Sequence, residues 1–279
     1  MRFFFTFSYR MQAVIIGFHI YKLTNDPLAL GLIGLSEAIP AIGIALYGGY
    51  LADKLEKRGL LLKVFCGVIL CSIVMLVATS SYMPKYGLGD YIVPTMYAMI
   101  FGIGVARGFF SPTTFSVMAQ IVPRELYPNA TTWNSSSWQF ASIIGPAIGG
   151  LVYGYFGITV TYFVIIFFLV IAFACIFFLN KHQPKFVPTT NIVQSLSEGI
   201  KFVFKTRMMV WAMTLDLFSV FFGGAVALLP VFAHDILKVG AQGLGYMQAA
   251  SSLGAVVTML IMTRHSPMHK PWRNLLIAV

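Results

Sequence analysis

The sequence predicts an all-helical membrane protein, and three observations support this. Apolar stretches of about 20 residues, the length that an α-helix needs to cross the hydrocarbon core of a bilayer, recur along the chain. Only 10% of the residues are charged, whereas soluble domains have about 25%. The charged residues gather in the short segments between the apolar stretches. The chain is therefore expected to cross a membrane several times as a bundle of helices.

Six of these stretches lie in the first 180 residues and are expected to form a first helical bundle. The first stretch is predicted to be a retained helix, because Arg10 interrupts it where the core of a secretion signal would be uniformly apolar. The predicted helices cover residues 3–23, 28–52, 60–80, 91–118, 130–156 and 159–179.

A polar segment follows the sixth stretch and divides the chain. Within it, apolar residues recur at helical spacing over 192–204, so we expect a short amphipathic helix along the membrane surface. The predicted domains are an N-terminal six-helix bundle at 1–180, a cytoplasmic linker at 181–207 and a partial C-terminal bundle at 208–279.

The C-terminal part is predicted to hold two helices, at 208–232 and 244–263, and a ninth apolar run opens at Leu275. When the chain is shifted by 214 positions, the segments 28–52 and 244–263 and the connections after them stay in register. Many transporters are built from such repeated halves, so this weak repeat supports two related bundles.

The basic residues predict the orientation in the membrane. Of the 19 Lys and Arg residues, 14 fall on one side of the predicted helices, 3 fall on the other, and Arg10 and Arg107 lie within spans. Because basic loops stay in the cytoplasm, the N-terminus and the linker are expected there, in a multi-pass protein of the cell inner membrane. The net charge of +10 therefore calls for no nucleic-acid partner.

The sequence predicts no cofactor and no metal site. The cysteines, Cys66, Cys71 and Cys175, lie in apolar runs without the Cys-x-x-Cys spacing of a metal or redox site. No cluster of metal ligands and no nucleophile motif appears either. A membrane-embedded enzyme is therefore the weaker reading, and we expect a protein that is not an enzyme.

A charged hairpin, GGYLADKLEKRG at 48–59, separates the second and third predicted helices. It resembles the loop between helices 2 and 3 of the major facilitator superfamily, whose pattern is G-x-L-A-D-R-x-G-R-[RK]; Glu56 stands where that pattern has its second glycine. The resemblance implies a gating loop, in which an acidic side chain at a helix end locks two bundles together. The bland alternative is a solvated turn. The gating residues that the resemblance implies are Gly49, Asp53, Lys54, Lys57 and Arg58.

A second motif, GPAIGG at 145–150, lies in the fifth predicted helix. Its proline cannot donate a backbone hydrogen bond and its glycines lack side chains, so the helix can bend there and let another helix approach closely. It resembles the end of the G-P-x-x-G-G motif of facilitator-type drug exporters, although Ala141 stands where that motif has an earlier glycine. The alternative is ordinary helix packing. The predicted hinge comprises Gly145, Pro146, Gly149 and Gly150.

Further segments, among them PLALGLIGLSEAIP at 27–40 and LGYMQAASSLGA at 244–255, resemble the branch that includes enterobactin-type siderophore exporters. Proteins of the superfamily have twelve helices. The resemblance therefore implies a major-facilitator-type bundle, C-terminally truncated, with the first six-helix half, helices 7 and 8, and the start of helix 9.

Three ionisable side chains lie inside predicted helices, where a charge is costly unless it is paired or faces water. Arg10, Arg107 and Asp216 come to similar depths, so they are expected to meet where the two bundles face each other. In one reading Asp216 pairs with an arginine and forms a gate. In the other, the two arginines bind an anionic substrate. The gate is the slightly favoured reading.

Glu37 in the second predicted helix is the best candidate for proton coupling, with a simple hydrogen-bonded carboxylate as the equally weighted alternative. Trp133, Asn134, Trp138 and Gln139 form a polar and aromatic stripe suited to a cavity wall, although Trp133 also fits an interfacial anchor.

These observations predict a secondary active transporter that exports a small, siderophore-like or drug-like molecule by alternating access, driven by proton entry. The expected partners are the substrate, the proton and the lipid bilayer, with no nucleic acid, and the protein is expected to act as a monomer. A lipid or metabolite carrier on the same fold and a non-transporting fragment are the alternatives.

Overall fold

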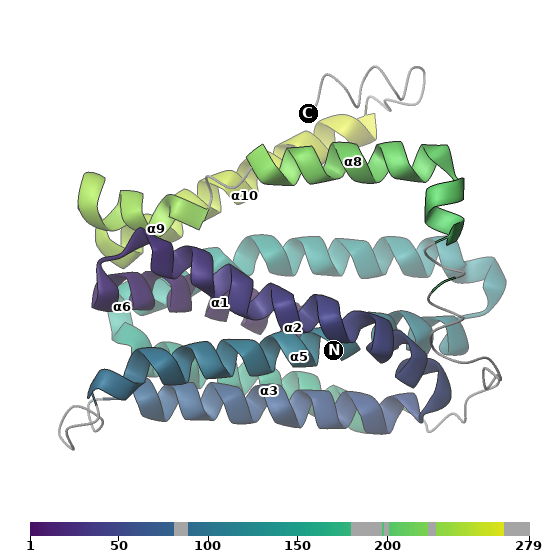
Figure 1. Cartoon of the computed structure of the whole chain (residues 1–279), viewed down its shortest axis with the longest axis horizontal. Coiled ribbons are helices and arrows are strands. Elements are labelled where there is room, and N and C mark those ends of the chain that lie inside the picture. The colour runs from purple at the N-terminus through teal and green to yellow at the C-terminus, as the bar shows by residue number, and fades with distance from the viewer. Residues whose placement is uncertain (81–88, 180–196, 198–200, 223–226, 265–279) are drawn as a thin grey trace.

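The computed structural model describes residues 1–80, 89–179, 197, 201–222 and 227–264, and all regular elements among them are helical (Figure 1). This confirms the predicted all-helical class. The long helices of the first half are α1 (Arg2–Thr24), α2 (Pro27–Lys54), α3 (Lys57–Thr79), α5 (Ile92–Ile121) and α6 (Tyr127–Phe177), with short 3-10 turns η1 (Gly89–Tyr91) and η2 (Arg124–Leu126).

The helix α6 is two helices joined at Gly157, where the backbone takes φ 79° and ψ 178°. Only glycine adopts this conformation without steric cost, so the chain can reverse there within a single residue. Its second segment returns to the end of the bundle where α3 begins, because Arg58 of α3 contacts Phe177. The two segments match the predicted helices at 130–156 and 159–179.

Helix ends are set by local sequence. After α1, Asn25 adopts a left-handed conformation with φ 50°, and its amide donates to the carbonyl oxygen of Tyr21. Asp26 then caps α2 by accepting a hydrogen bond of 2.9 Å from the amide of Leu28, while Pro27 fills the first helical position. The tight turn between α1 and α2 follows from this Asn-Asp-Pro sequence.

The connections between helices gather at two ends of the bundle (Figure 1), and the charged residues of the sequence are distributed unevenly between these ends. We call the end with the α2–α3 connection, Leu55–Glu56, and the α5–α6 connection, 122–126, the basic end. The far end holds the α1–α2 turn, Gly157 and residues 227–239. Among the described residues, four stretches are long and apolar enough to cross a membrane, namely Pro27–Ala45, Lys57–Thr79, Gly89–Ile121 and Asn129–Phe177.

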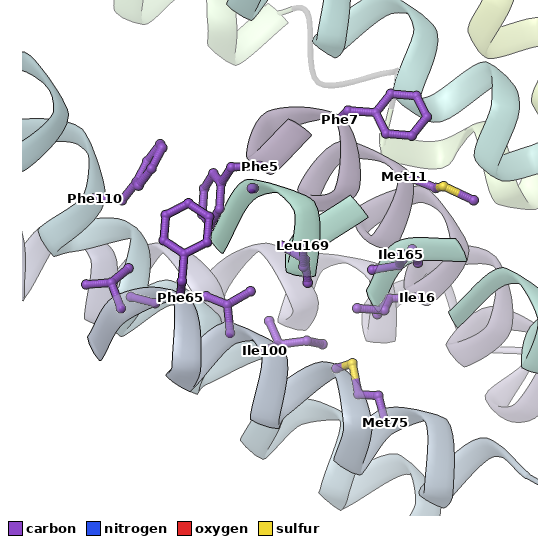
Figure 2. Packing of buried hydrophobic residues seen from close by; sticks show 14 of the residues in the cluster. Phe5, Phe7, Met11, Ile16, Phe65, Met75, Ile100, Phe110, Ile165 and Leu169 are labelled. Atoms are coloured by element: carbon purple, nitrogen blue, oxygen red, sulfur yellow. The ribbon is translucent and has the colours of Figure 1, made fainter. Parts of the chain in front are cut away.

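Aromatic and sulfur-containing side chains fill the core of the first half (Figure 2). The rings of Phe5 and Phe110 stack with centroids 3.9 Å apart, and Phe65 lies 5.0 Å from Phe5. Met11 and Met75 are completely buried. This core holds α1, α3, α5 and the second segment of α6 together, and it fixes α1 as the central helix of the bundle.

Close contacts between α2 and α5 depend on glycine. A Cβ atom on Gly104 would lie 2.5 Å from the carbonyl oxygen of Glu37, and one on Gly48 would lie 2.6 Å from the carbonyl oxygen of Gly108. Small residues let two membrane helices approach until their backbones touch. The backbone of Glu37 is thereby pressed against α5.

The second half comprises α8 (Arg207–Phe222), α9 (Leu229–Val231), the π-helical turn η4 (Phe232–Ile236) and α10 (Gly240–Arg264). The predicted helix at 208–232 is wrong in its extent, because residues 227–228 form a 3-10 turn and a separate short helix, α9, begins at Leu229. A proline lacks the amide hydrogen and fits the first turn of a helix. The predicted amphipathic helix at 192–204 lies mostly outside the described residues, of which 201–205 are helical, and the run at Leu275 lies wholly outside them.

Arg58 connects the start of α3 to the end of α6. Its Nη2 donates a 3.2 Å hydrogen bond to the carbonyl oxygen of Phe177, and its guanidinium carbon lies 5.8 Å from the centroid of that ring. A cation near a helix C-terminus satisfies carbonyls that the helix leaves unpaired. We expect Arg58→Gln to cost about 1 kcal/mol of stability, measured as a lower midpoint of thermal unfolding in detergent. Arg124→Gln, at an exposed position of η2, is the matched control, and an equal loss in both variants would contradict the assignment.

Candidate substrate and coupling site

Three side chains from three helices meet inside the first bundle. Glu37 of α2 forms an ion pair with Arg107 of α5 through its Oε1. The hydroxyl of Tyr9 on α1 donates to the same oxygen at 2.5 Å and accepts a 2.7 Å hydrogen bond from Nη1 of Arg107. The Arg107 guanidinium also lies 4.6 Å from the centroid of the Tyr9 ring. We refer to Tyr9, Glu37 and Arg107 as the triad.

The triad joins a carboxylate, that of Glu37, to a guanidinium, that of Arg107, within the membrane-spanning part of the protein. The Glu37 side chain is 17% exposed and that of Arg107 is 42% exposed, so the arginine is the member that reaches open space. A partly buried charge of either sign is costly without its partner. Protonation of Glu37 would therefore weaken the hold on Arg107, and this is the chemical change that the arrangement can perform.

The predicted meeting of Arg10 and Arg107 with Asp216 is not what the structure shows. Asp216 lies exposed on α8 and forms no ion pair with either arginine; the acid that Arg107 takes is Glu37. Arg10 instead lies 5.6 Å from the centroid of the Trp138 ring, and its Nε is buried without a hydrogen-bond partner. In this structure the ion pair of Arg107 lies within the first half, and the Asp216 gate stays a prediction.

Two adjoining cavities lie beside the triad, and Arg2 and Trp138 line both of them. The larger, of about 490 Å³, has a polar wall of threonine, serine and glutamine side chains from the first turns of α6. The smaller, of about 200 Å³, reaches Tyr9, Arg10 and Arg107. The larger cavity has the size of small-molecule sites, which occupy about 300–1,000 Å³, and the smaller one lies below that range.

Only part of the polar and aromatic stripe predicted on the fifth helix lies in the wall of the larger cavity. Trp138 and Gln139 line the larger cavity. Asn134 belongs to the lining of neither cavity, and Trp133 is 71% exposed on another face of α6. The sequence pattern located the right helix, whereas the helical rotation decided which side chains face the cavity. Tyr9 and Arg2 were missed, because nothing in their sequence surroundings distinguishes them.

Glu37 also lines a cavity of about 30 Å³ together with Tyr9 and Gln12. This cavity lies on the side of the triad away from the two cavities that Arg2 and Trp138 line. That volume is sufficient for a single water molecule. Ala13 and Ile33 line both this cavity and another of about 240 Å³, which reaches α9 and α10. Glu37 thus lies between the 30 Å³ cavity, which it lines, and the 200 Å³ cavity, which its partners Tyr9 and Arg107 line.

The predicted gating loop is a connection of two residues, Leu55 and Glu56. Lys54 is exposed with its Nζ 5.6 Å from the centroid of the Tyr50 ring, and Lys57 is buried. A side chain on Gly49 would meet nothing within 4 Å. Arg58 binds α6, and the side chain of Asp53 lies outside those described. The gating role of this loop stays a prediction.

The GPAIGG motif contacts two helices. A Cβ atom on Gly145 would lie 3.0 Å from Cβ of Arg10, and one on Gly149 would lie 2.8 Å from Cγ of Met11, so both glycines face α1. Gly150 faces α10, where its Cβ would lie 2.5 Å from Cα of Gly245. Pro146 lies inside α6. The close approach is present, and the hinge function of these four residues stays a prediction.

The two halves of the protein meet at the far end. The side chains of Phe18, Ala233 and Leu244 form a small buried cluster there, and Tyr21 of α1 donates a hydrogen bond to Oδ2 of Asp235 in η4. By contrast, α8 has no extensive contact with another described helix and runs apart from the first bundle (Figure 1). The halves are therefore joined at the far end, while the two cavities that Arg2 and Trp138 line lie toward the basic end.

Two hydrogen bonds hold the pKa of Asp235 below its usual range: the one from Tyr21 has the larger effect and the one from His234 the smaller. Because the pKa of Asp235 is lower in the folded protein than in the unfolded one, its ionised carboxylate stabilises the far-end contact at any pH above the unfolded pKa. This stabilisation is lost as the pH falls through the pKa of the folded protein. We expect the far-end contact to be constant from pH 8 to about pH 5 and to loosen below about pH 4. The measurement is the distance between spin labels on Lys22→Cys and Leu237→Cys. Asp235→Asn should remove the pH dependence, and a loosening that persists in this variant would contradict the assignment.

An all-helical membrane protein whose halves join at one end, with charged cavities toward the other, has the architecture of a facilitator-type carrier. Residues 4–270 match the family described as transmembrane secretion effector, and the chain therefore belongs to this family of the major facilitator superfamily. It is 21% identical over 257 residues to the uncharacterized MFS-type transporter YfmI of Bacillus subtilis (strain 168), covering 88% of this chain and 60% of that protein.

The fold is similar to that of a solved transporter, reported as the in meso crystal structure of the POT family transporter PepTSo. The TM-score is 0.54 at 16% identity, and the match covers 95% of this chain and 53% of that one. At this identity the likeness shows the fold alone. The chain spans less than two thirds of the length of both of these proteins.

Proposed function

We propose that the protein serves secondary active transport, exporting a small molecule by alternating access with proton entry as the driving force. The triad is the observation that carries this proposal. Glu37 is a protonatable group paired with Arg107, which lines a cavity of about 200 Å³, and a separate small cavity reaches Glu37 from the far side. Proton binding at Glu37 and substrate binding near Arg107 would thereby affect each other.

The proposed cycle alternates which end of the protein is open. The far-end contacts of Tyr21 with Asp235 and of Gly150 with Gly245 hold the halves together at that end. Opening the far end requires these contacts to separate. Proton entry from that side would neutralise Glu37 and release Arg107 toward the cavity.

Export is the direction that the family description, transmembrane secretion effector, supports. The uneven distribution of basic residues supports an N-terminus in the cytoplasm and a place in the cell inner membrane. The segments that resemble enterobactin-type exporters support a siderophore-like or drug-like substrate. A lipid or metabolite carrier is the remaining candidate on this fold.

Transport by the purified protein in proteoliposomes under an imposed pH gradient tests the proposal. We expect either 2,3-dihydroxybenzoate or the hydrophobic cation ethidium to move against its gradient and to stop when a protonophore collapses the pH gradient. Liposomes without protein are the control. Transport that does not depend on the pH gradient would rule out proton coupling. If neither compound is transported, the result counts against export of siderophore-like and drug-like molecules.

A further inference from the structure

We propose that the substrate is an organic anion with a flat apolar part, and that Arg10 binds its acidic group; this rests on the proposed transport function. The argument begins with the charges of the smaller cavity. Three arginines line it, namely Arg2, Arg10 and Arg107. Among the residues that the structure describes, Arg107 is the one of these three arginines that is paired with an acid, and no carboxylate of a described residue lines either cavity.

Arg10 is held in place but left without an acid. Its Nε is buried and has no hydrogen-bond partner, while its guanidinium lies 5.6 Å from the centroid of Trp138 and 5.9 Å from that of Tyr9. Aromatic faces stabilise a cation but do not satisfy its donors. A planar guanidinium with free donors is the group that recognises carboxylates and other oxyanions.

The position of Arg10 is fixed by the glycine motif of α6. A Cβ atom on Gly145 would lie 3.0 Å from the Cβ of Arg10, so only a glycine lets the arginine stay where it is without a shift. Arg2, whose Nε is also buried without a partner, lines the same cavity and adds a second positive charge. The positive charge is therefore built into the contact between α1 and α6.

The neighbouring groups indicate the rest of the ligand. Trp138 is 39% exposed and lines both cavities, so a flat apolar ring can lie against it. Beyond it, Ser135, Ser136 and Gln139 offer hydrogen bonds for polar substituents. Because the site contains unpaired cations, a cationic ligand would be repelled and a neutral one would leave Arg10 unsatisfied.

Binding of three probes of matched shape tests this inference without any gradient. The probes are 2-naphthoate, neutral 2-naphthamide and cationic 2-naphthylmethylammonium, measured by calorimetry on the purified chain in lipid nanodiscs. We expect naphthoate to bind about 10- to 100-fold more tightly than naphthamide. Arg10→Gln should abolish this difference, and Arg10→Lys should keep part of it. Arg124→Gln, an exposed arginine of η2, should leave it unchanged.

Two results would overturn the inference: an equal or higher affinity for the amide or the cation, and an anion preference that survives in Arg10→Gln. Absence of binding by all three probes also counts against it. Thermal unfolding of each variant shows whether a loss reflects misfolding, and the comparison among probes in the unchanged protein needs no variant. If naphthoate binds through Arg10 but neither 2,3-dihydroxybenzoate nor ethidium is transported, the proposed function fails alone. If ethidium is transported while naphthoate does not bind, the anion inference fails alone.

Discussion

Replacing Glu37 by glutamine is expected to abolish proton-driven transport while substrate exchange across the membrane continues. Glutamine keeps the shape of the side chain and can still accept from Tyr9 and Arg107, but it cannot take up or release a proton. The loss of gradient-driven accumulation should be on the order of tenfold or more, as for other couplings between binding events. Uptake by proteoliposomes with and without a pH gradient measures it.

Glu125→Gln is the matched control, because Glu125 lies exposed in η2 and contacts neither the triad nor the cavities. It should leave both driven accumulation and exchange unchanged. If Glu37→Gln still accumulates substrate in proportion to the pH gradient, the proton is taken up elsewhere and the role assigned to the triad is wrong.

Replacing Gly150 by valine is expected to open the far end of the protein. Every side chain at this position would run into the backbone of α10, since its Cβ would lie 2.5 Å from Cα of Gly245. Backbone cannot rotate away as a side chain can, so the two helices must separate. Forced overpacking of this kind costs about 1–3 kcal/mol, and here it falls on the arrangement in which α6 and α10 are in contact. The distance between labels on Lys22→Cys and Leu237→Cys should lengthen.

Gly31→Val provides the comparison for this variant. Gly31 is also a glycine within a membrane helix, but a side chain there would meet nothing within 4 Å. The far-end distance should therefore stay as it is in the unchanged protein. A Gly150→Val variant with the same label distance as Gly31→Val would show that the contact with α10 does not hold the far end closed.

Much of the first half could be predicted from the sequence, because membrane helices are long and their ends are marked locally. The apolar stretches predicted six helices, and the break at Gly157 fell between two of them. The second half was harder to predict. The predicted helix at 208–232 ran past Pro230, although a proline in an apolar run is itself a sign that a new helical turn can begin there.

The partners within the site could not be predicted by counting along helices. At 1.5 Å per residue, Arg107 lies about 24 Å and Glu37 about 14 Å from the same end of the bundle, which seemed to separate them. The arginine side chain is long and leans toward the N-terminus of its helix, in the direction of Glu37. Asp216 lies on α8, which runs apart from the first bundle, and the contact of Tyr9 with Glu37 and Arg107 depends on how α1, α2 and α5 pack.

The two-residue connection of Leu55 and Glu56 has a mechanical consequence. Two residues span at most about 7 Å, so neither α2 nor α3 can slide by a full turn without pulling the other. Arg58 ties α3 to the end of α6, the single-residue reversal at Gly157 ties the two segments of α6, and the backbone contact at Gly104 presses α2 against α5. A force on any one of these helices is shared by the others, so we expect the helices of the first half to move together.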